Sequence, residues 1–513
     1  MGLDSALSIA TSGLSNINAR YATIAQNVAN ANTPGYLREV STQQAVTSDG
    51  ISLGVHTGKT VLQVDLALQS WSLRQNATVA NLETTQTALQ AIDTSLGTPG
   101  SGADIGSLLG KLQDGFSTLL TNPASTPQQS AVVSAAAALA QGINSLSAAY
   151  TTQRQGAQDD LVSAVDTLNS TLATIGQLSD RITALGPTSL STADLENQRN
   201  AAVQTLSKLV DIKTTVQPNG DLSVITTSGM SLPTHQGTSG GNLPFSIAGG
   251  NALPGSFYPG GGLPGIMLGS VDVTKQLQGG RIGADVTLRD TTLPTYQAEL
   301  DEFAYGLSSR FAAQGLTLFT RPNGTVPAGG GTQTQSTYVG YAGAIQVNPA
   351  VTVNPALVRD GTTAIAGSSA GASAFTPNPT TGPAGFTTMI NRVLTYTFGS
   401  EVQQNGALQP AMTTTGLGAD GTLAAPFAAP PTLAGYATDL VAAQSQVSST
   451  ISTDLTNEQA VQTSLNEKIS TISGVNMDTE MSQMIALQTA YSANARIIAA
   501  VQSMYNQLMQ VVQ

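Results

Sequence analysis

The sequence predicts a multidomain, mainly α-helical protein with inserted β structure, in which helices at the two chain ends form a coiled-coil-like pair. Apolar residues recur at steps of three and four through residues 71–210 and again at both ends, which is the period of amphipathic helices. The period changes to two over residues 210–226, which indicates a β-hairpin. A chain of 513 residues is too long for one hydrophobic core, so several domains are expected.

The first helix is expected over residues 3–30, and one apolar stripe runs along it with the spacing of a heptad repeat. The stripe consists of Leu7, Ala10, Leu14, Ile17, Tyr21, Ile24 and Val28. Asn32 is a candidate left-handed cap, and Pro34 followed by Gly35 favours a tight turn after the helix. Residues 51–68 alternate only partly, so we expect them to be extended or to form short β structure.

Four helices are expected next, over residues 71–96, 105–121, 127–186 and 193–209. The third is the longest and ends at Gly186-Pro187, where the apolar repeat stops. Within and before it lies an uncharged stretch that resembles a membrane span in length. Prolines and amides interrupt this stretch and its centre is only weakly hydrophobic, so we expect a buried helix and no membrane insertion.

The second half of the chain is more varied. The hairpin over residues 210–226 turns at Pro218-Asn219-Gly220-Asp221, and residues 237–265 are rich in Gly and Pro and expected to be irregular. A further helix is expected over residues 293–313. Residues 318–431 are rich in Gly, Pro, Thr and Ala, and we expect loops with a small β or mixed insertion. Two final helices are expected, over residues 436–472 and 477–512.

The last helix carries a second apolar stripe with heptad spacing. It consists of Met484, Leu487, Tyr491, Asn494, Ile498, Val501, Tyr505, Leu508 and Val512. Asn494 is the polar member, and a single polar residue in such a stripe can fix the register of a coiled coil. The two terminal stripes either close a helical bundle within one chain or join neighbouring subunits. Because isolated helices rich in Ala, Gln and Asn are marginal, we expect both ends to become ordered on assembly.

Composition excludes several classes of function. The net charge is −12 with only 19 Lys and Arg residues, which argues against nucleic-acid binding, since binding to phosphates needs clustered cations. The chain has no Cys, so disulfides and thiolate chemistry are excluded, and this suits exposure outside the cell. No basic region followed by a continuous apolar run marks a cleaved secretory signal.

Residues with catalytic chemistry are few and isolated. His56 and His235 have no carboxylate at ligand spacing, and the neighbouring Asp159 and Asp160 point in different directions on a helix. The acids of the central insertion, Asp360, Glu401 and Asp420, are also isolated. We therefore expect no enzyme activity, no metal and no cofactor.

Two terminal motifs resemble those of the axial proteins of the bacterial flagellum. The first spans residues 24–36 and the second spans residues 473–478 and 488–496. The motif residues singled out are Asn27, Asn30, Thr33, Pro34, Gly35, Tyr36, Gly474, Val475, Asn476 and Asn494. Residues 194–200 and 279–284 are similar to the hook-associated members that form the junction between hook and filament. The resemblance covers residues 1–230, 275–318 and 436–513, and it fails over residues 318–435.

The resemblance implies a structural subunit that is exported without a cleaved signal and acts outside the cell. It implies a ring of identical subunits, with the hook protein and the third hook-associated protein as neighbours and an export chaperone. The terminal helices would form the inner tube. The expected division has four parts: terminal helices, 1–60 with 473–513; a helical rod, 61–210 with 280–318 and 436–472; a small β-rich domain, 211–279; and a variable insertion, 319–435.

Three alternatives to a junction protein remain at this point. Another axial protein, of the hook or distal rod, would be richer in β structure between its ends. A coiled-coil surface adhesin would form a stable oligomer through the stripes and bind a host or matrix ligand. A wall hydrolase is the weakest alternative, because it would need a carboxylate pair in the insertion.

Overall fold

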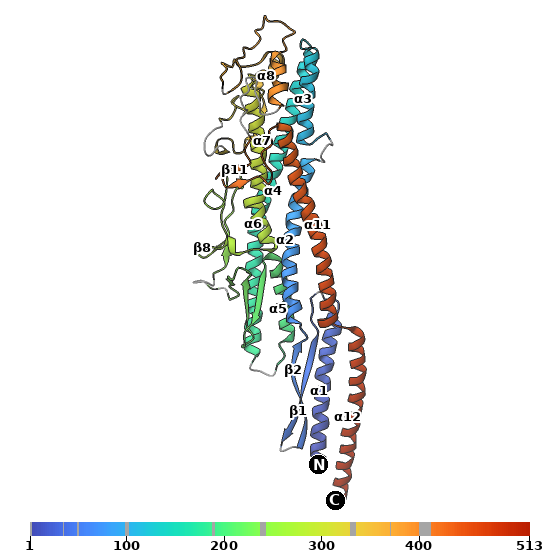
Figure 1. Ribbon diagram of the computed structural model, residues 1–513. Coiled ribbons are helices and arrows are strands. Elements are labelled where there is room, and N and C mark those ends of the chain that lie inside the picture. Colours follow the sequence, from blue (N-terminus) through green and yellow to red (C-terminus); the bar gives the residue numbers. More distant parts are fainter. Residues whose placement is uncertain are drawn as a thin grey trace.

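The computed structural model describes residues 3–33, 35–48, 51–97, 102–186, 190–235, 237, 243–328, 335–369, 371–399 and 412–512. The protein is elongated, and both chain ends lie at the same tip (Figure 1). Long helices run along its length, and short strands and loops cover one side of the helices. The predicted architecture, mainly α-helical with inserted β structure and paired terminal helices, is confirmed.

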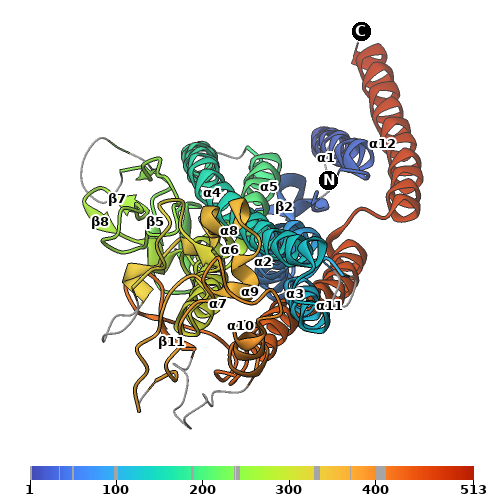
Figure 2. The ribbon, with the colours of Figure 1, turned by 90° about the horizontal axis from the view of Figure 1, so that it is seen from above.

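Four elements build the tip that carries both ends, which we call the terminal unit. They are α1 (Leu3–Asn30), β1 (Glu39–Ser48), β2 (Ile51–Leu62) and α12 (Met477–Val512). The two strands pair as an antiparallel hairpin with register shifts between Ser41 and Gln43 and between Val46 and Thr47. In the view from above, α1 lies between the hairpin and α12 (Figure 2). The sequence indicated extended structure only after residue 51, so β1 was missed.

The terminal unit is joined to a long helical part, the rod. Its helices are α2 (Leu66–Leu96), α3 (Ile105–Thr121), α4 (Thr126–Leu185), α5 (Ala193–Leu209) and α11 (Leu433–Ser473). The bounds of α3 and α5 agree with those predicted. The start of α2 does not, because Asp65 caps this helix by accepting hydrogen bonds from the amides of Ala67 and Leu68. Leu66 is exposed, so the apolar period gave no signal for this first turn.

The helix α4 forms the spine of the rod. By length and composition alone it is apolar enough to cross a membrane. Large apolar side chains along this helix are instead buried inside the protein. This agrees with the buried helix that was expected because prolines and amides interrupt the uncharged stretch. Val132, Leu139, Ile143 and Leu146 belong to one hydrophobic core, and Leu161, Leu168 and Ile175 belong to a second core further along.

The second core lies beneath the small sheets. The strands β3 (Ile212–Val216), β4 (Leu222–Thr226) and β5 (Ser231–Leu232) form one antiparallel sheet, as the hairpin pattern predicted for its first two strands. The strands β6 (Phe245–Ser246), β7 (Met267–Leu268) and β8 (Val271–Asp272) form another. Ile212, Val224 and Phe245 pack against α4 and α5 in this core.

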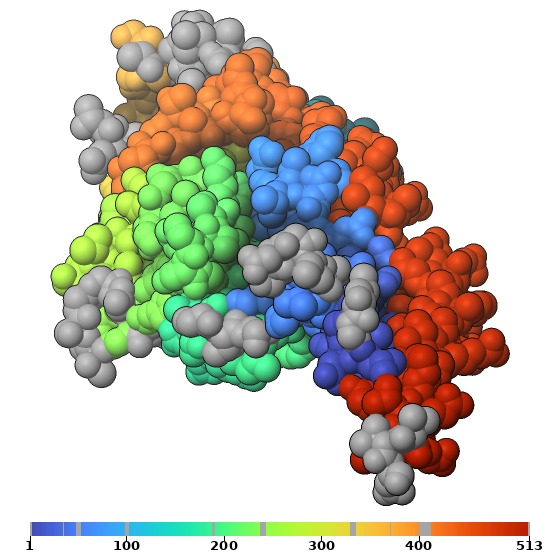
Figure 3. All heavy atoms as spheres, turned by 90° about the horizontal axis from the view of Figure 1, so that it is seen from below, coloured from blue at the N-terminus to red at the C-terminus, as the bar shows by residue number. Residues whose placement is uncertain are grey.

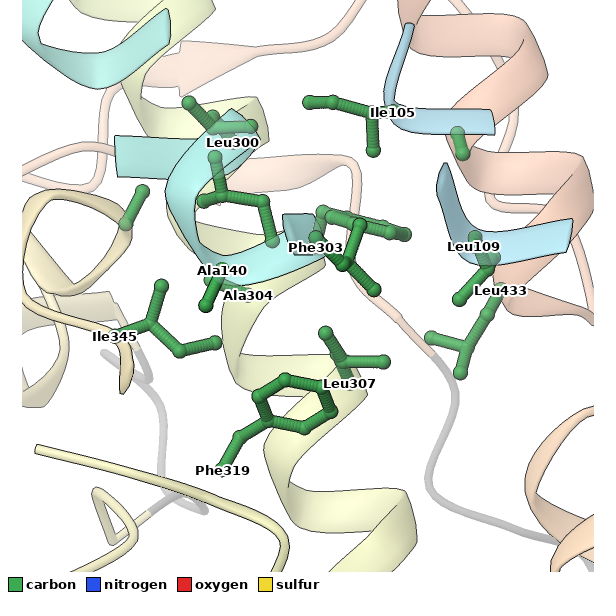
Figure 4. Packing of buried hydrophobic residues seen from close by; sticks show 14 of the residues in the cluster. Ile105, Leu109, Ala140, Leu300, Phe303, Ala304, Leu307, Phe319, Ile345 and Leu433 are labelled. Atoms are coloured by element: carbon green, nitrogen blue, oxygen red, sulfur yellow. The ribbon is translucent and has the colours of Figure 1, made fainter. Parts of the chain in front are cut away.

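The first core lies around α7 (Leu293–Ala313), which follows α6 (Gly280–Thr287) and a π-helical turn, η3 (Leu288–Thr292). Figure 4 shows Leu300, Phe303 and Leu307 of α7 packed between residues of α3, α4 and α11. Burying side chains of this size stabilises by about 1.5–3 kcal/mol each before conformational entropy is subtracted. This core therefore fixes the upper end of the rod.

The described residues between 319 and 431 contribute their buried apolar side chains to that core. Phe319, Tyr338, Ile345 and Met389 all belong to the core around α7, so the boundary expected at residue 319 does not separate two hydrophobic cores. Short elements make up this segment: β9 (Phe319–Thr320), η4 (Gln335–Thr337), η5 (Tyr341–Gly343), β10 (Gln346–Val347), α8 (Pro349–Val353), α9 (Leu357–Asp360), α10 (Thr388–Arg392), η6 (Val393–Thr397), β11 (Thr415–Leu417) and β12 (Leu423–Ala424).

Three neighbouring carboxyl groups of α7 are buried in this part of the rod. Asp301 accepts hydrogen bonds from the amides of Gly340 and Ala342, at 2.7 and 2.8 Å. Glu302 accepts from the amide of Thr413 at 2.7 Å, and Glu299 accepts from the Gln444 side chain at 3.2 Å. Burial raises the pKa of Glu299 to about 8 and that of Asp301 to about 7. These groups tie α11 and the segments around residues 340 and 413 to α7.

Candidate assembly interface

The terminal helices α1 and α12 lie side by side along most of their length. Figure 3 shows them at the near end of the protein, α1 in dark blue against α12 in red. Ile17, Ile24 and Leu487 form the buried centre of their contact. Tyr21, Val28, Met484 and Ala490 pack around this centre and are partly buried. The Tyr21 hydroxyl also donates to the Met484 carbonyl, at 3.2 Å.

The other predicted stripe residues divide into two groups. Leu7, Leu14 and Ile498 are half-buried, and Val501 is buried. Tyr505 is half-buried, and its hydroxyl donates to Asp4. Tyr491 and Leu508, by contrast, are exposed, at 44% and 56%. The side chain of Val512 lies outside the described residues.

The exposure of Tyr491 and Leu508 has geometric causes. Ala490, one residue earlier, packs against the buried centre of the contact, so the face toward α1 passes beside Tyr491. Leu508 follows Tyr505, which already meets the first turn of α1 at Asp4. The described part of α1 begins at Leu3, one residue before Asp4. Neither side chain therefore lies in the contact between the two helices.

Asn494 faces the one position of α1 that has no side chain. A Cβ atom added to Gly13 would lie 3.2 Å from Oδ1 and 3.3 Å from Nδ2 of Asn494. The side-chain amide of Asn494 donates to the Ala490 carbonyl of its own helix, at 3.1 Å. The fit between Asn494 and Gly13 is therefore steric, and it identifies Gly13 as an interface residue that the apolar pattern missed.

Replacing Gly13 with Leu is expected to reduce the amount of subunit in assembled structures by at least tenfold, because the new side chain must displace Asn494 and with it α12. The measurement is an immunoblot of the purified assemblies. Gly110→Leu is the control, since Gly110 also lies in a helix, α3, and a Cβ there meets nothing within 4 Å. Equal amounts of both variants would contradict the assignment.

The opposite face of α1 packs on the β1–β2 hairpin through small and polar residues. Ser12 Oγ accepts from the Val55 amide at 3.2 Å, and Asn16 donates to Thr57 Oγ1 at 3.4 Å. Gly54 has a φ of +124°, and a Cβ there would lie 2.3 Å from Ser12 Oγ. Only glycine fits at this close approach. The hairpin thereby holds α1 from the side away from α12.

The N-terminal motif builds the turn between α1 and the hairpin. Asn27 binds both main-chain groups of Glu39, donating to its carbonyl and accepting from its amide, each at 2.9 Å. The Tyr36 hydroxyl donates to Asn27 Oδ1 at 3.1 Å. Burial and nearby Glu39 raise the pKa of Tyr36, so this hydroxyl keeps its proton. Asn27 and Tyr36 therefore set the angle at which the chain leaves α1.

The remaining residues of that motif make local contacts. Thr33 binds Asn30 twice, with its amide to the carbonyl at 2.9 Å and its hydroxyl to Oδ1 at 3.4 Å. Gly35 has a φ of +78° and lies against Gln204 of α5. Pro34 lies outside the described residues. These contacts place the turn against the rod.

The C-terminal motif starts α12. Asn476 caps this helix by accepting from the Thr479 amide at 3.0 Å. A Cβ on Gly474 would lie 2.4 Å from the Ser470 carbonyl oxygen, so this position needs glycine. Val475 between them is half-buried. The motif therefore ends α11 and begins α12 within three residues, at the level of the N-terminal turn.

Polar contacts join the terminal unit to the rod. Arg38 holds α12 within the terminal unit by an ion pair with buried Glu480 at 2.6 Å. Its amide reaches the rod by donating to the Ser473 carbonyl of α11 at 2.8 Å. Asn197 of α5 binds Leu37 twice, donating to its carbonyl at 3.0 Å and accepting from its amide at 2.9 Å. The Gln63 side chain donates to the Ile472 carbonyl at 2.9 Å. The sequence did not single out these residues, although Asn197 and Arg38 lie in or beside the quoted motifs.

The described residues hold no group of three His, Cys, Asp or Glu side chains that could bind a metal ion. His235 lies at the surface, 3.1 Å from Asp180, and Asp160 pairs with Arg281 at 2.7 Å. Asp360 pairs with Arg359, and Asp420 accepts from Thr422 in its own turn. Glu401 lies outside the described residues.

Three models of flagellar protein families match successive parts of the chain, one at each end and one between them. The model named 'Flagellar hook-associated protein FlgK helical domain' matches residues 89–324. This range begins in the last part of α2 and extends past the end of α7. This part of the chain is therefore similar to the helical domain of FlgK, a flagellar hook-associated protein. The ends match models shared with other axial members of the flagellum. Residues 7–36 match the flagella basal body rod protein, and residues 469–511 match the C-terminal part of the basal body rod FlgEFG proteins.

Individual FlgK-family members match about half of the chain. Flagellar hook-associated protein 1 of Bacillus subtilis (strain 168) is 28% identical over 243 residues, which are 45% of this chain and 46% of that protein. The solved structure of the flagellar hook junction protein FlgK from Burkholderia pseudomallei is 25% identical, with a TM-score of 0.40, over 50% of this chain and 46% of that one. The chain thus spans about half the length of the relatives it matches.

Proposed function

We propose that this protein is a structural subunit of the bacterial flagellum and forms the junction between hook and filament. The observation that carries the proposal is the order of the three family matches along one chain, with a hook-associated helical domain between two axial termini. The helical domain distinguishes this proposal from a hook or distal rod protein, whose shared motifs lie at the ends. The proposed role is mechanical and needs no catalytic group.

We propose the terminal unit as the surface through which the subunits assemble. Large exposed apolar side chains gather there and at its junction with the rod, whereas the much larger remainder carries few. Such exposure on one region marks a contact surface for other proteins. The exposed residues of this region are Val46, Leu53, Val61, Leu66, Trp71, Val461, Ile472, Met477, Met481, Ile485, Tyr491, Ile497, Met504, Leu508 and Met509.

The proposed neighbours follow from the family. They are further copies of this chain in a ring, the hook protein on one side and the third hook-associated protein on the other. An export chaperone would hold the subunit before assembly, and the protein would act outside the cell after export without signal cleavage. The contact of α1 with α12 buries few large residues, which supports ordering of both ends on assembly.

A strain lacking this protein is expected to make intact hooks, secrete flagellin into the medium and carry no attached filaments. The reason is that the proposed junction would be missing while export and hook assembly continue. Electron microscopy of cells shows whether hooks and filaments are present, and an immunoblot of the medium measures the secreted flagellin. Restoring the gene is the control. Loss of the hook itself would instead indicate a rod or hook subunit, and normal filaments would contradict the proposed function.

A further inference from the structure

The sulfur atoms of this protein are concentrated in its last helix. The chain has ten methionines and no cysteine, so every sulfur atom belongs to a methionine thioether. Five of the ten lie in α12, and they are Met477, Met481, Met484, Met504 and Met509. Thioethers are readily oxidised to sulfoxides, and here no thiol competes with them for the oxidant.

Four of the methionines in α12 are open to solvent. Their exposed fractions are 44% for Met477, 46% for Met481, 46% for Met504 and 63% for Met509. We call these four the exposed α12 methionines. In the view from above, α12 lies at the edge of the molecule beside α1 (Figure 2). A small oxidant dissolved in water therefore reaches these side chains in the free subunit.

The other methionines are better covered. Met389 and Met412, at 0% and 3% exposed, belong to the core around α7. Met484 is half-buried against the centre of the contact between α1 and α12. Met230 and Met267 are also half-buried. In the part of the chain that the structure describes, the accessible thioethers are thus gathered on the helix that we propose for assembly.

We propose that peroxides modify the exposed α12 methionines, and that this modification keeps the free subunit out of assembled structures. The first part stands on the exposure of the four side chains alone. The second part rests on the proposed function, in which the terminal unit is the surface through which subunits assemble. Oxidation would thereby act on the subunit before it is incorporated.

The modification is the transfer of one oxygen atom. The sulfur lone pair attacks an oxygen of hydrogen peroxide, so that an S–O bond forms as the O–O bond breaks. The hydroxide that leaves takes the proton of the transferred hydroxyl group and becomes water. Sulfur is oxidised by two electrons and the peroxide is reduced by two. The product is a methionine sulfoxide, whose oxygen is polar.

The sulfoxides change the contact surface and leave the fold of the subunit intact. None of the exposed α12 methionines is among the residues packed in the contact with α1. In the free subunit the new oxygen is hydrated, but in an apolar contact with a neighbouring protein it would be buried without a donor. Met477 and Met481 are four residues apart and share one face of the helix, so both oxygens would enter the same contact.

The sites of oxidation are found by mass spectrometry of the purified secreted subunit after hydrogen peroxide has been added and then removed with catalase. Fragmentation of the peptides locates each sulfoxide. The exposed α12 methionines are expected to react faster than Met389 and Met412 by about tenfold or more, because the core excludes the oxidant. Equal rates at the two groups would overturn the first part. In isolated flagella the four are expected to be protected, and equal rates in flagella and free subunit would overturn the second part.

The effect on assembly is measured by adding the treated subunit to cells of the strain that lacks this protein, followed by an immunoblot of isolated hooks. Oxidation is expected to lower binding of the native chain by about tenfold or more. A chain with leucine at all four positions is expected to lose none of its own untreated binding, since leucine has a similar volume and no sulfur. The control carries Met389→Leu and Met412→Leu and is expected to remain as sensitive as the native chain.

Equal binding of the treated and untreated native chain would overturn the effect on assembly, and so would an equal loss in the chain with four leucines. If that chain does not bind hooks even without peroxide, enzymatic reduction decides. The two methionine sulfoxide reductases, one for each sulfoxide epimer, are expected to restore binding of the oxidised native chain, and failure to restore it would overturn the inference. Failure of the untreated native chain to bind hooks would contradict the proposed function itself, whereas the order of oxidation is decided by mass alone.

Discussion

Replacing Leu487 with Asp is expected to abolish incorporation of the subunit into flagella while the rod remains folded. Leu487 is 4% exposed and packs between Ile17 and Ile24. Placing a carboxylate there removes apolar contacts and buries an unpaired charge, which costs about 4 kcal/mol or more. The contact between α1 and α12 is small, so a loss of this size separates the helices.

Two measurements on the Leu487→Asp variant check this result. Circular dichroism of the secreted subunit is expected to show a melting transition of the rod close to that of the native chain. The amount in purified flagella and swimming in soft agar are expected to fall to the level of the deletion strain. Gln488→Asp is the matched control, because it adds the same charge at the next, exposed position of α12. Normal swimming of the Leu487→Asp strain would refute the role of this contact.

Raising the pH from 5.5 to 8 is expected to lower the stability of the rod. Burial raises the pKa of Glu299 to about 8, so the folded protein keeps a proton that the unfolded chain releases near pH 4.3. Between these two pH values the folded state binds more protons, and stability falls as the pH rises. The contribution of Glu299 over this interval is about 3 kcal/mol at most. Asp301 and Asp285, with pKa values of about 7, act in the same direction.

Glu299→Gln is expected to reduce this dependence, because the amide resembles the protonated carboxyl group. The measurement is the midpoint of thermal unfolding of the isolated subunit at pH 5.5 and pH 8, in the native chain and the variant. Glu467→Gln on the exposed side of α11 is expected to keep the native dependence on pH. A Glu299→Gln variant with the same slope as the native chain would show that this carboxyl group does not keep its proton.

The sequence was sufficient to predict the elements whose residues follow a regular period. The helices α3 and α5, the β3–β4 hairpin and the two final helices lie close to their predicted bounds. The reason is that the apolar residues of each element repeat at a regular period, and α3 and α5 bury this apolar face along their length. The apolar residues Ile17, Ile24, Leu487 and Val501 of the terminal stripes are buried for the same reason.

The contacts that position the terminal unit gave no such signal. Asn197 binds Leu37 across 160 residues, and Arg38 meets Glu480 across 442 residues. A single amide or ion pair between distant residues has no repeat that a pattern could show. The strand β1 was missed because its residues are mostly polar or exposed. Gly13 was missed because its role is to have no side chain.

The pairing of α1 with α12 joins two segments that lie far apart in the sequence. The hydrogen bond from Tyr21 to Met484 spans 463 residues, so it forms only after the segment that contains Met484 has been made. A product cut short anywhere in the rod or the insertion retains α1 but has nothing to cover Ile17 and Ile24. Such fragments lack the surface proposed for assembly. Truncated subunits would then be excluded from assembly without a separate quality-control protein, because they cannot form the contact between α1 and α12.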